Sequence, residues 1–431
     1  MSFPRIKTFA VLALLLALGS CKVNTINSFP TNPASVRYGA FMPNAPLVNV
    51  QVQGTTAWTN VPFQSITDYQ QFNNQQTNFT VYLTTDAVNS VASGSVSLSG
   101  QTTYTLVGFG TIQQSSLLFQ DDTIPNMGTG DTQLRAANLG FGYSAVSVYI
   151  TAPGVDITTV SPTYTLAYGG STSFQTYLAG DYEVRVTPYG QYTLIYDSGT
   201  VNFPVNASQG LYLYGITATH SLNVLQANVN NGVTKPLPNL LAALKVVNAA
   251  YQRADVDLKV NGILEVGNLA TNTATVSYIP VTAGENILWF NDTLVPNTTI
   301  AAVTTTLNAS TDSTVMVSGA AGSEVATVFP DYNTPPTSND ARIRVINASP
   351  DAPAFDVAVD GSVAATNVQY TKASAYFDVA SGNHTITLLA TGTTTTILTI
   401  SNQPFGGGGV FSIYLTGPNS ALTELLVQDN V

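Results

Sequence analysis

Short stretches of alternating apolar and polar residues run through the chain, with turn-forming residues between them. Phe355, Val357 and Val359 alternate with polar or small residues, and Asp360-Gly361 ends this stretch. A period of two with one apolar face is typical of a half-buried β-strand, and an Asp-Gly pair is typical of a hairpin turn. Further strands are predicted at residues 80–84, 103–108, 192–196, 210–215, 314–318 and 410–415, and strand–turn–strand units at residues 179–186, 283–289 and 379–388. No long helical pattern of the kind a βαβ crossover needs is present, so the chain is predicted to be all-β.

One sequence pattern recurs four times. Residues 341–361 carry it in full, residues 244–262 repeat it 99 positions earlier, residues 36–54 repeat it 307 positions earlier, and a fourth copy opens at Leu134. Each copy has a basic residue near the start of its first predicted strand, namely Arg37, Arg135, Lys245 and Arg344. Their spacings of 98, 110 and 99 residues match one small β domain and are too long for a solenoid repeat.

Segments rich in turn formers and without apolar periodicity separate the copies, at residues 121–131, 231–239 and 331–340. Together with the repeat, these linkers predict four tandem antiparallel β-sandwich modules of immunoglobulin-like type. The predicted organisation is a signal peptide at 1–20, a tether at 21–34, and modules at 35–122, 132–230, 241–332 and 341–431.

The C-terminal copy resembles a known bacterial family. Residues 341–361, 367–370 and 379–385 are similar to the domain of unknown function 4397, and the third copy keeps the landmarks Asn248-Ala249 and Asn261-Gly262. The first two copies are more divergent. The resemblance implies an exported β-sandwich module, often in tandem and often on lipoproteins or cell-surface proteins. It implies no activity and no catalytic residues.

The N-terminus predicts export and lipidation. Arg5 and Lys7 precede an apolar run of 11 residues, which is too short to span a bilayer as a helix. The following Leu-Gly-Ser-Cys motif resembles a bacterial lipobox, and its Cys21 is the only cysteine of the chain. The resemblance implies cleavage before Cys21 and lipid on its sulfur, so that lipid chains hold the protein to a membrane. Lys22 stands where an inner-membrane retention signal would place Asp, which favours the outer membrane. An ordinary secretory signal peptide is the alternative.

Composition excludes several classes of function. The mature chain carries 11 basic against 24 acidic side chains, a net charge of −13, so no basic surface is available for nucleic acid. Charged residues make up only 9% of the sequence, which favours neutral polar contacts with glycans or proteins over ionic ones. Lipidation of Cys21 leaves no thiol for disulfides, catalysis or a Cys-based metal site.

The candidate polar residues point to structure more than to chemistry. We expect the basic residue of each copy on the outward face of its first strand, paired with a strand acid, although it could instead bind a ligand. Asp351, Asp356 and Asp360 come together in the fourth copy alone, so calcium binding there stays an open alternative and no metal or cofactor is assigned. His384 is expected in a solvated turn, His220 has no partner at metal-ligand spacing, and no catalytic residue is assigned.

Aromatic residues suggest a binding surface. Eleven of the 21 tyrosines lie between Tyr143 and Tyr214, and on an exposed sheet they could stack sugar rings or anchor a protein. The alternative is that tyrosine simply favours strands. The predicted function is a noncatalytic, lipid-anchored cell-envelope protein, an array of spacer, adhesion or binding modules extending up to roughly 120 Å. The alternative is a surface glycan-processing hydrolase or an accessory glycan-binding lipoprotein.

Overall fold

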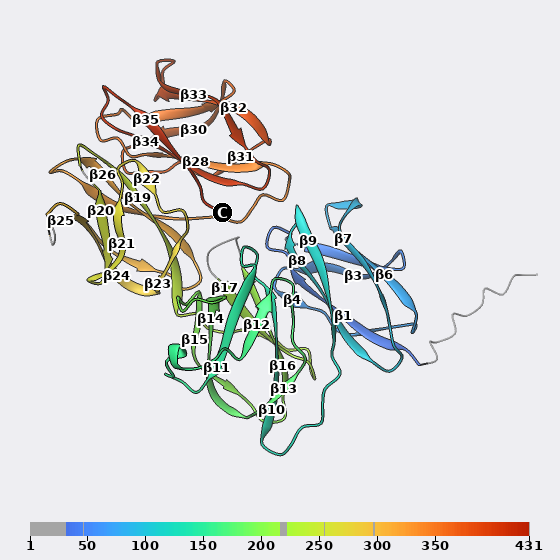
Figure 1. Cartoon of the computed structure of the whole chain (residues 1–431). Helices are drawn as coiled ribbons and strands as arrows, with labels where there is room; N and C mark the ends of the chain where they lie inside the picture. Colours follow the sequence, from blue (N-terminus) through green and yellow to red (C-terminus); the bar gives the residue numbers. More distant parts are fainter. Residues whose placement is uncertain (1–31, 46, 216–221, 254, 296–297, 431) are drawn as a thin grey trace, which may run out of the picture.

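A computed structural model describes residues 32–45, 47–215, 222–253, 255–295 and 298–430, which fold into four β-sandwiches (Figure 1). The predicted signal peptide, Cys21, most of the tether and His220 lie outside these residues. Within them, one short 3₁₀ helix at Ile157–Thr159 interrupts the strands, and no helix is long and apolar enough to cross a membrane. The predicted all-β fold of tandem sandwiches is confirmed.

Modules 1 and 2 occupy the first half of the chain. The strands of module 1 are β1 (Ala34–Phe41), β2 (Leu47–Val52), β3 (Thr55–Pro62), β4 (Ser65–Ile66), β5 (Gln70–Phe72), β6 (Gln76–Leu83), β7 (Asp86–Ser97), β8 (Thr103–Thr111) and β9 (Gln114–Asp121). Those of module 2 are β10 (Asp131–Leu139), β11 (Ala145–Thr151), β12 (Tyr164–Ala167), β13 (Gln175–Leu178), β14 (Gly180–Pro188), β15 (Tyr196–Phe203), β16 (Ser208–Gly215), β17 (Leu222–Asn228) and β18 (Thr234–Pro236). Module 2 thus extends through β18, which pairs with β17 inside the segment predicted to be a linker.

Modules 3 and 4 repeat the arrangement. The strands of module 3 are β19 (Leu241–Tyr251), β20 (Val256–Val260), β21 (Ile263–Leu269), β22 (Thr273–Ala274), β23 (Ile279–Thr282), β24 (Gly284–Asp292), β25 (Thr299–Leu307), β26 (Asp312–Ala320) and β27 (Val325–Pro330). Those of module 4 are β28 (Ala341–Asn347), β29 (Phe355–Val359), β30 (Ser362–Val368), β31 (Phe377–Val379), β32 (Gly382–Ala390), β33 (Thr396–Phe405), β34 (Val410–Thr416) and β35 (Thr423–Gln428).

Each module packs two sheets with a common core order, and in modules 1 to 3 the sheet that contains the first strand has a fifth, short strand. In module 4 one sheet runs β31-β28-β34-β35 and the other β30-β29-β32-β33. The first strand lies in the middle of its sheet, parallel to β34 and antiparallel to β31, and the parallel pair recurs in all four modules. This four-plus-four order differs from the immunoglobulin order, in which strands ABED face strands CFG. It places the first strand of each module at the centre of one sheet, where both of its faces are covered.

The turn predicted at Asp360-Gly361 is confirmed, whereas the three predicted strand–turn–strand units are not hairpins. Asp360 and Gly361 both have positive φ values, 48° and 83°, as the two-residue turn between β29 and β30 requires. The predicted unit at residues 379–388 is not a hairpin, because β31 pairs with β28 in one sheet and β32 with β29 in the other. The chain therefore crosses from one sheet to the other at this point, and it does the same at residues 179–186 and 283–289. The strand predicted at 192–196 is a loop up to residue 195.

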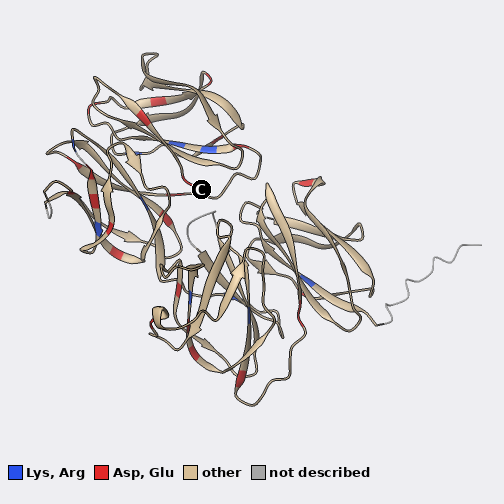
Figure 2. Ribbon diagram, in the orientation of Figure 1, with Lys and Arg blue, Asp and Glu red and all other residues tan. Residues whose placement is uncertain are grey.

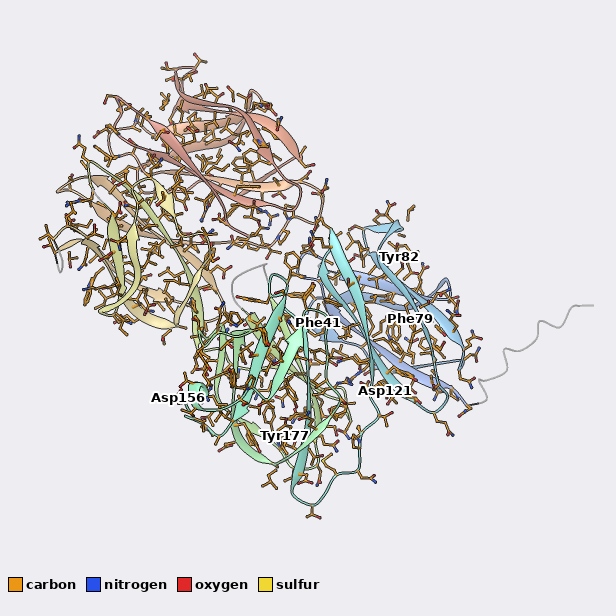
Figure 3. All side chains as sticks on the ribbon, in the orientation of Figure 1. Phe41, Phe79, Tyr82, Asp121, Asp156 and Tyr177 are labelled. Atoms are coloured by element: carbon orange, nitrogen blue, oxygen red, sulfur yellow. The ribbon has the colours of Figure 1, made fainter. Side chains whose placement is uncertain are left out.

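The first strands bury both of their faces. In module 3, Leu244 and Val246 face the core of the sandwich, whereas Val247 and Ala249 belong to a second apolar cluster with Ile346 and other residues of module 4. Modules 1 and 2 share an equivalent cluster, in which the Phe41 and Tyr212 rings stack at 5.3 Å; Figure 3 shows Phe41 where these two modules meet. The sandwiches therefore dock in two pairs, 1 with 2 and 3 with 4, through the sheets that contain the parallel strands.

The pairs also contact each other, and the four modules do not form a straight row (Figure 1). Leu240 donates its N–H to the carbonyl of Asp197 and accepts from Ala283, which joins module 2 directly to module 3. Asn44 and Gln113 of module 1 donate to the carbonyl of Pro336, in the segment between modules 3 and 4. Because the chain folds back on itself in this way, the predicted extension of roughly 120 Å is wrong for this arrangement.

Candidate functional site

A buried ionic cluster lies between modules 3 and 4, and we call it the 3–4 centre. Lys245 of β19 contacts the Asp429 carboxylate of module 4 at 3.4 Å, and Arg344 of β28 contacts the Asp331 carboxylate at 2.5 Å. Asp331 and Asp429 each directly follow the last strand of their module. Each cation is thus paired with the acid of the opposite module, and all four side chains are 2% exposed or less.

Hydroxyl groups from neighbouring strands complete the 3–4 centre. Thr314 of β26 donates to Asp331 at 2.6 Å, and Ser412 of β34 donates to Asp429 at 2.5 Å. The Nε of Arg344 donates in turn to the Ser412 hydroxyl at 2.8 Å. A buried charge is tolerated only when it is paired and hydrogen-bonded, and the two modules together supply both conditions.

Modules 1 and 2 form a similar cluster, the 1–2 centre, around Asp122. Arg135 of β10 donates to the Asp122 carboxylate at 2.5 Å, and Arg37 of β1 approaches it at 3.8 Å. Thr105 and Tyr69 donate to the same carboxylate at 2.6 and 2.5 Å. One buried carboxylate therefore pairs with two buried arginines. Figure 2 shows how few other basic residues the described part of the chain contains.

Module 2 lacks the acid that its counterparts carry. The backbone N–H of Asp429 donates to the carbonyl of Val410 in module 4, and the backbone N–H of Val229 donates to the carbonyl of Ser208 in module 2. Val229 therefore occupies the position in module 2 that Asp429 occupies in module 4. The next residues support this equivalence, because the Asn430 side chain accepts the N–H of Val410 and the Asn230 side chain accepts the N–H of Ser208. Arg37 consequently has no acid from the opposite module, and its two terminal nitrogens have no hydrogen-bond partner among the described residues.

An aromatic ring faces the cation in each first strand. The distances from the charged group to the ring centroid are 4.8 Å for Arg37 and Tyr69, 4.7 Å for Arg135 and Phe174, 4.8 Å for Lys245 and Tyr278, and 5.0 Å for Arg344 and Tyr376. Such cation–π contacts stabilise a cation that has left water. The aromatic rings therefore belong, with the hydroxyls and acids, to the two centres that surround the basic residues.

The sequence-based prediction for these basic residues was only half right. They do point away from the core of their own sandwich, as predicted. That face is covered by the neighbouring module, however, and the partner acids lie in the segments after the last strands rather than on strands. The signal that would have found them is spacing, because Asp122 and Asp429 follow Arg37 and Arg344 by 85 residues each, and Asp331 follows Lys245 by 86.

The comparison with known families agrees with this repeated geometry. The sequence profile of the family described as "Domain of unknown function (DUF4397)" matches residues 34–149, 242–358 and 341–431. The chain belongs to the DUF4397 family. The first two matches each begin in the first strand of an odd-numbered module and end in the second strand of its docked partner. No curated protein matches the chain.

The three acids considered for calcium in this DUF4397 protein have separate structural roles. Asp351 accepts the Tyr251 hydroxyl of module 3 at 3.0 Å. Asp356 accepts backbone N–H groups of Asn367 and Gly392 at 2.8 and 3.0 Å. No group of three or more His, Cys, Asp or Glu side chains suited to a metal ion occurs in the described part of the chain.

His384 is not simply a solvated turn residue, as the sequence suggested. It lies at the start of β32, where its Nδ1 contacts the Asp360 carboxylate at 2.7 Å and its Nε2 contacts the Ala380 carbonyl at 2.7 Å. The hydrogen bond to Asp360 raises the pKa of His384 above its usual value. Its imidazole closes one end of module 4, and this contact bridges strands rather than serving an identified reaction.

The tyrosines of module 2 do not form an exposed platform. Tyr149, Tyr164, Tyr196, Tyr212 and Tyr214 are all buried. Tyr189 and Tyr192 are well exposed, at 64% and 57%, and both lie in the loop between β14 and β15. Most of the tyrosine enrichment therefore serves the core of the sandwich and the interface with module 1.

Proposed function

We propose that this DUF4397 protein is a lipid-anchored, noncatalytic binding scaffold of the bacterial cell envelope, held through Cys21 and directed to the outer membrane. Its partner is a glycan or an envelope protein, and not a nucleic acid. The observation that carries the proposal is the pairwise docking through buried charges, which holds the two modules of each pair in a fixed arrangement. Such an arrangement positions loops and sheet ends for contact, as in other proteins where a rigid framework carries binding segments.

The roles of the acidic residues support a noncatalytic function. Asp122, Asp331 and Asp429 are buried in the docking centres, and Asp356 and Asp360 hold turns of module 4. Glycoside hydrolysis needs two carboxyl groups on opposite sides of a bound sugar. These five carboxylates instead accept hydrogen bonds from side chains or backbone N–H groups of the protein. Release of reducing sugar from a polysaccharide by the purified protein, abolished by a single acid substitution, would overturn this part of the proposal.

Anchoring can be tested at Cys21. We expect Cys21→Ala to move the protein from the membrane fraction to the soluble fraction, because the residue that carries the lipid is removed. Lys22→Asp is the matched control: it leaves the lipid in place and should shift the protein from the outer to the inner membrane. Fractionation followed by immunoblotting measures both effects. Unchanged membrane association of Cys21→Ala would contradict the proposed anchor.

The docked arrangement predicts a compact particle in solution. Four modules of about 30 Å in a straight row would have a radius of gyration of about 35 Å, whereas a compact chain of this length has about 22 Å. We expect small-angle X-ray scattering of the mature protein to give about 22–27 Å, close to the compact value. A value near that of the straight row would show that the modules are undocked and would remove the observation on which the scaffold rests.

A further inference from the structure

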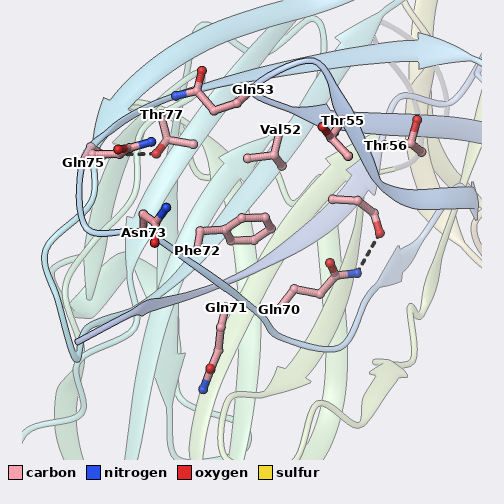
Figure 4. Close-up of a pocket in the computed structure, with 11 residues that line it drawn as sticks. Val52, Gln53, Thr55, Thr56, Gln70, Gln71, Phe72, Asn73, Gln75 and Thr77 are labelled. Atoms are coloured by element: carbon pink, nitrogen blue, oxygen red, sulfur yellow. Dashed lines mark hydrogen bonds between the residues drawn. The ribbon is translucent and has the colours of Figure 1, made fainter. Parts of the chain in front are cut away.

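One end of module 1 contains a hollow of about 440 Å³. It lies where β2, β3, β5 and β6 come together, and its lining includes Val52, Gln53, Gln70, Phe72, Gln75 and Thr77. In Figure 4 the Phe72 ring lies between Val52 and Gln70, whereas the side chain of Gln71 points away from them. We call this feature the module 1 hollow.

Modules 2 and 4 show a side chain that fills this position. The strand registers make Tyr182, Asn286 and His384 equivalent to Thr77. In modules 2 and 4 a ring reaches across the end of the sandwich, and it contacts the carbonyl of the residue four positions earlier: Tyr182 contacts Leu178 at 2.7 Å, and His384 contacts Ala380 at 2.7 Å. Thr77 is too short to do this and donates to Gln75 instead. The hollow is thus open in module 1 because a small residue replaces a ring.

Module 3 has a related hollow, but a neighbouring module forms part of its wall. Its volume is about 280 Å³, and Val260, Asn261 and Asn286 line it at positions equivalent to those in module 1. Thr193 and Leu194 of module 2 form part of its wall, and Glu265 adds a negative charge. Among the described residues, none from another module lines the module 1 hollow. In this part of the chain, the hollow of module 1 therefore has no wall from a neighbouring module.

The lining of the module 1 hollow is polar but uncharged. Residues 70–76 read Gln-Gln-Phe-Asn-Asn-Gln-Gln, whereas the equivalent stretch of module 4 contains the small pair Ser381-Gly382. Each amide side chain both donates and accepts hydrogen bonds. Some are committed within the protein, such as Gln70 to the carbonyl of Ala57 at 2.7 Å, while Gln71, Asn73 and Gln75 are exposed.

These features define the chemistry of a ligand. A charged ligand would find no opposite charge in the lining, and a purely apolar ligand would cover amides without pairing them, which is costly. An uncharged molecule with many hydroxyl groups and one apolar face meets both conditions. The apolar face has a partner in Phe72, whose ring is held by Trp58 at 5.7 Å and by Phe79 at 6.5 Å.

We infer that the module 1 hollow binds an uncharged saccharide, with a sugar ring against Phe72 and its hydroxyls on the surrounding amide and threonine side chains. This inference rests on the proposed function as a binding scaffold and adds the class of ligand and its place. It does not depend on the lipid anchor, since the hollow belongs to the folded module. A failure of anchoring and a failure of saccharide binding are therefore separate results.

The test is calorimetric titration of the mature protein with uncharged hexasaccharides: maltohexaose, cellohexaose, xylohexaose and mannohexaose. Hexagalacturonate and hexaglucosamine serve as negatively and positively charged comparisons. We expect at least one uncharged sugar to bind, and Thr77→Tyr to weaken that binding by roughly tenfold or more, because the ring fills the hollow as Tyr182 does in module 2. Asn78→Ala is the matched control and should change the affinity by less than about twofold, since Asn78 follows Thr77 in β6, is exposed and does not line the hollow.

Trp58 fluorescence, measured in a Trp289→Phe background, shows whether module 1 stays folded in each variant. If Thr77→Tyr fails to fold, the double variant Gln53→Ala with Gln75→Ala removes two amides from the lining and should weaken binding in its place. The inference is overturned if no uncharged hexasaccharide binds, if a charged one binds equally well, or if a folded variant with a blocked hollow binds as tightly as the original chain.

Discussion

Asp122→Asn is expected to unfold modules 1 and 2 at a clearly lower urea concentration than the original chain. Asp122 is the one carboxylate in the 1–2 centre, and both Arg37 and Arg135 depend on it. Removing one partner of a buried ion pair typically costs about 3–5 kcal/mol, because the remaining charge has lost its compensation. Arginine cannot relieve this cost by losing its proton.

Tryptophan fluorescence can assign the effect to one pair of modules. The chain has two tryptophans, Trp58 in module 1 and Trp289 in module 3, so a Trp289→Phe background reports on the first pair alone. Asp121→Asn is the matched control, since the Asp121 carboxylate caps an exposed turn by accepting the N–H of Thr123. A Trp58 transition that shifts no more in Asp122→Asn than in Asp121→Asn would contradict the structural role of the 1–2 centre.

Asp429→Asn is expected to destabilise modules 3 and 4 by about 2–4 kcal/mol at pH 7, with a loss that shrinks as the pH rises. The difference from Asp122 lies in the cation, because Asp429 pairs with Lys245. Burial lowers the pKa of Lys245, and Asp429 partly opposes that shift. Without Asp429 the pKa of Lys245 in the folded protein should fall further, and the lysine can then be buried without charge.

The sign of the pH effect follows from proton binding. Between the lowered pKa of folded Lys245 and the ordinary pKa of the unfolded chain, the unfolded state binds more protons, so stability rises with pH in this window. We expect Asp429→Asn to recover up to about 1.4 kcal/mol relative to the original chain for each pH unit above 7, until the pH reaches the lowered pKa of Lys245 in the original folded chain. Urea unfolding in a Trp58→Phe background, followed through Trp289, measures this. A loss that is constant with pH, as expected for Asp122→Asn, would show that Lys245 stays charged.

The sequence predicted the elements of the fold because its signals are local. Alternation at Phe355, Val357 and Val359 and the turn at Asp360-Gly361 each depend on a few neighbouring residues, and both are confirmed by β29 and its hairpin to β30. The crossovers could not be recognised in this way. An Ala-Gly or Ser-Gly pair marks a reversal of direction, but it does not encode whether the next strand joins the same sheet or the opposite one.

The docking centres were missed because their parts are far apart in the sequence. An arginine in the middle of a predicted strand is ordinarily evidence for an exposed face. Arg344 is buried because Asp331, from the segment before its own module, and Ser412, from a strand 68 residues later, both reach it. The module 1 hollow was missed for a related reason, since it becomes apparent only when Thr77 is compared with Tyr182 and His384 in aligned strands.

The exchange of charges between docked sandwiches has a consequence for how such chains grow. Arg37 and Lys245 are 208 residues apart, and Arg135 and Arg344 are 209 apart, so the two halves of the chain repeat as whole pairs. A chain that gained or lost a single sandwich would leave an unmatched ion and an apolar sheet in contact with water. We therefore expect chains that use this geometry to lengthen by whole docked pairs.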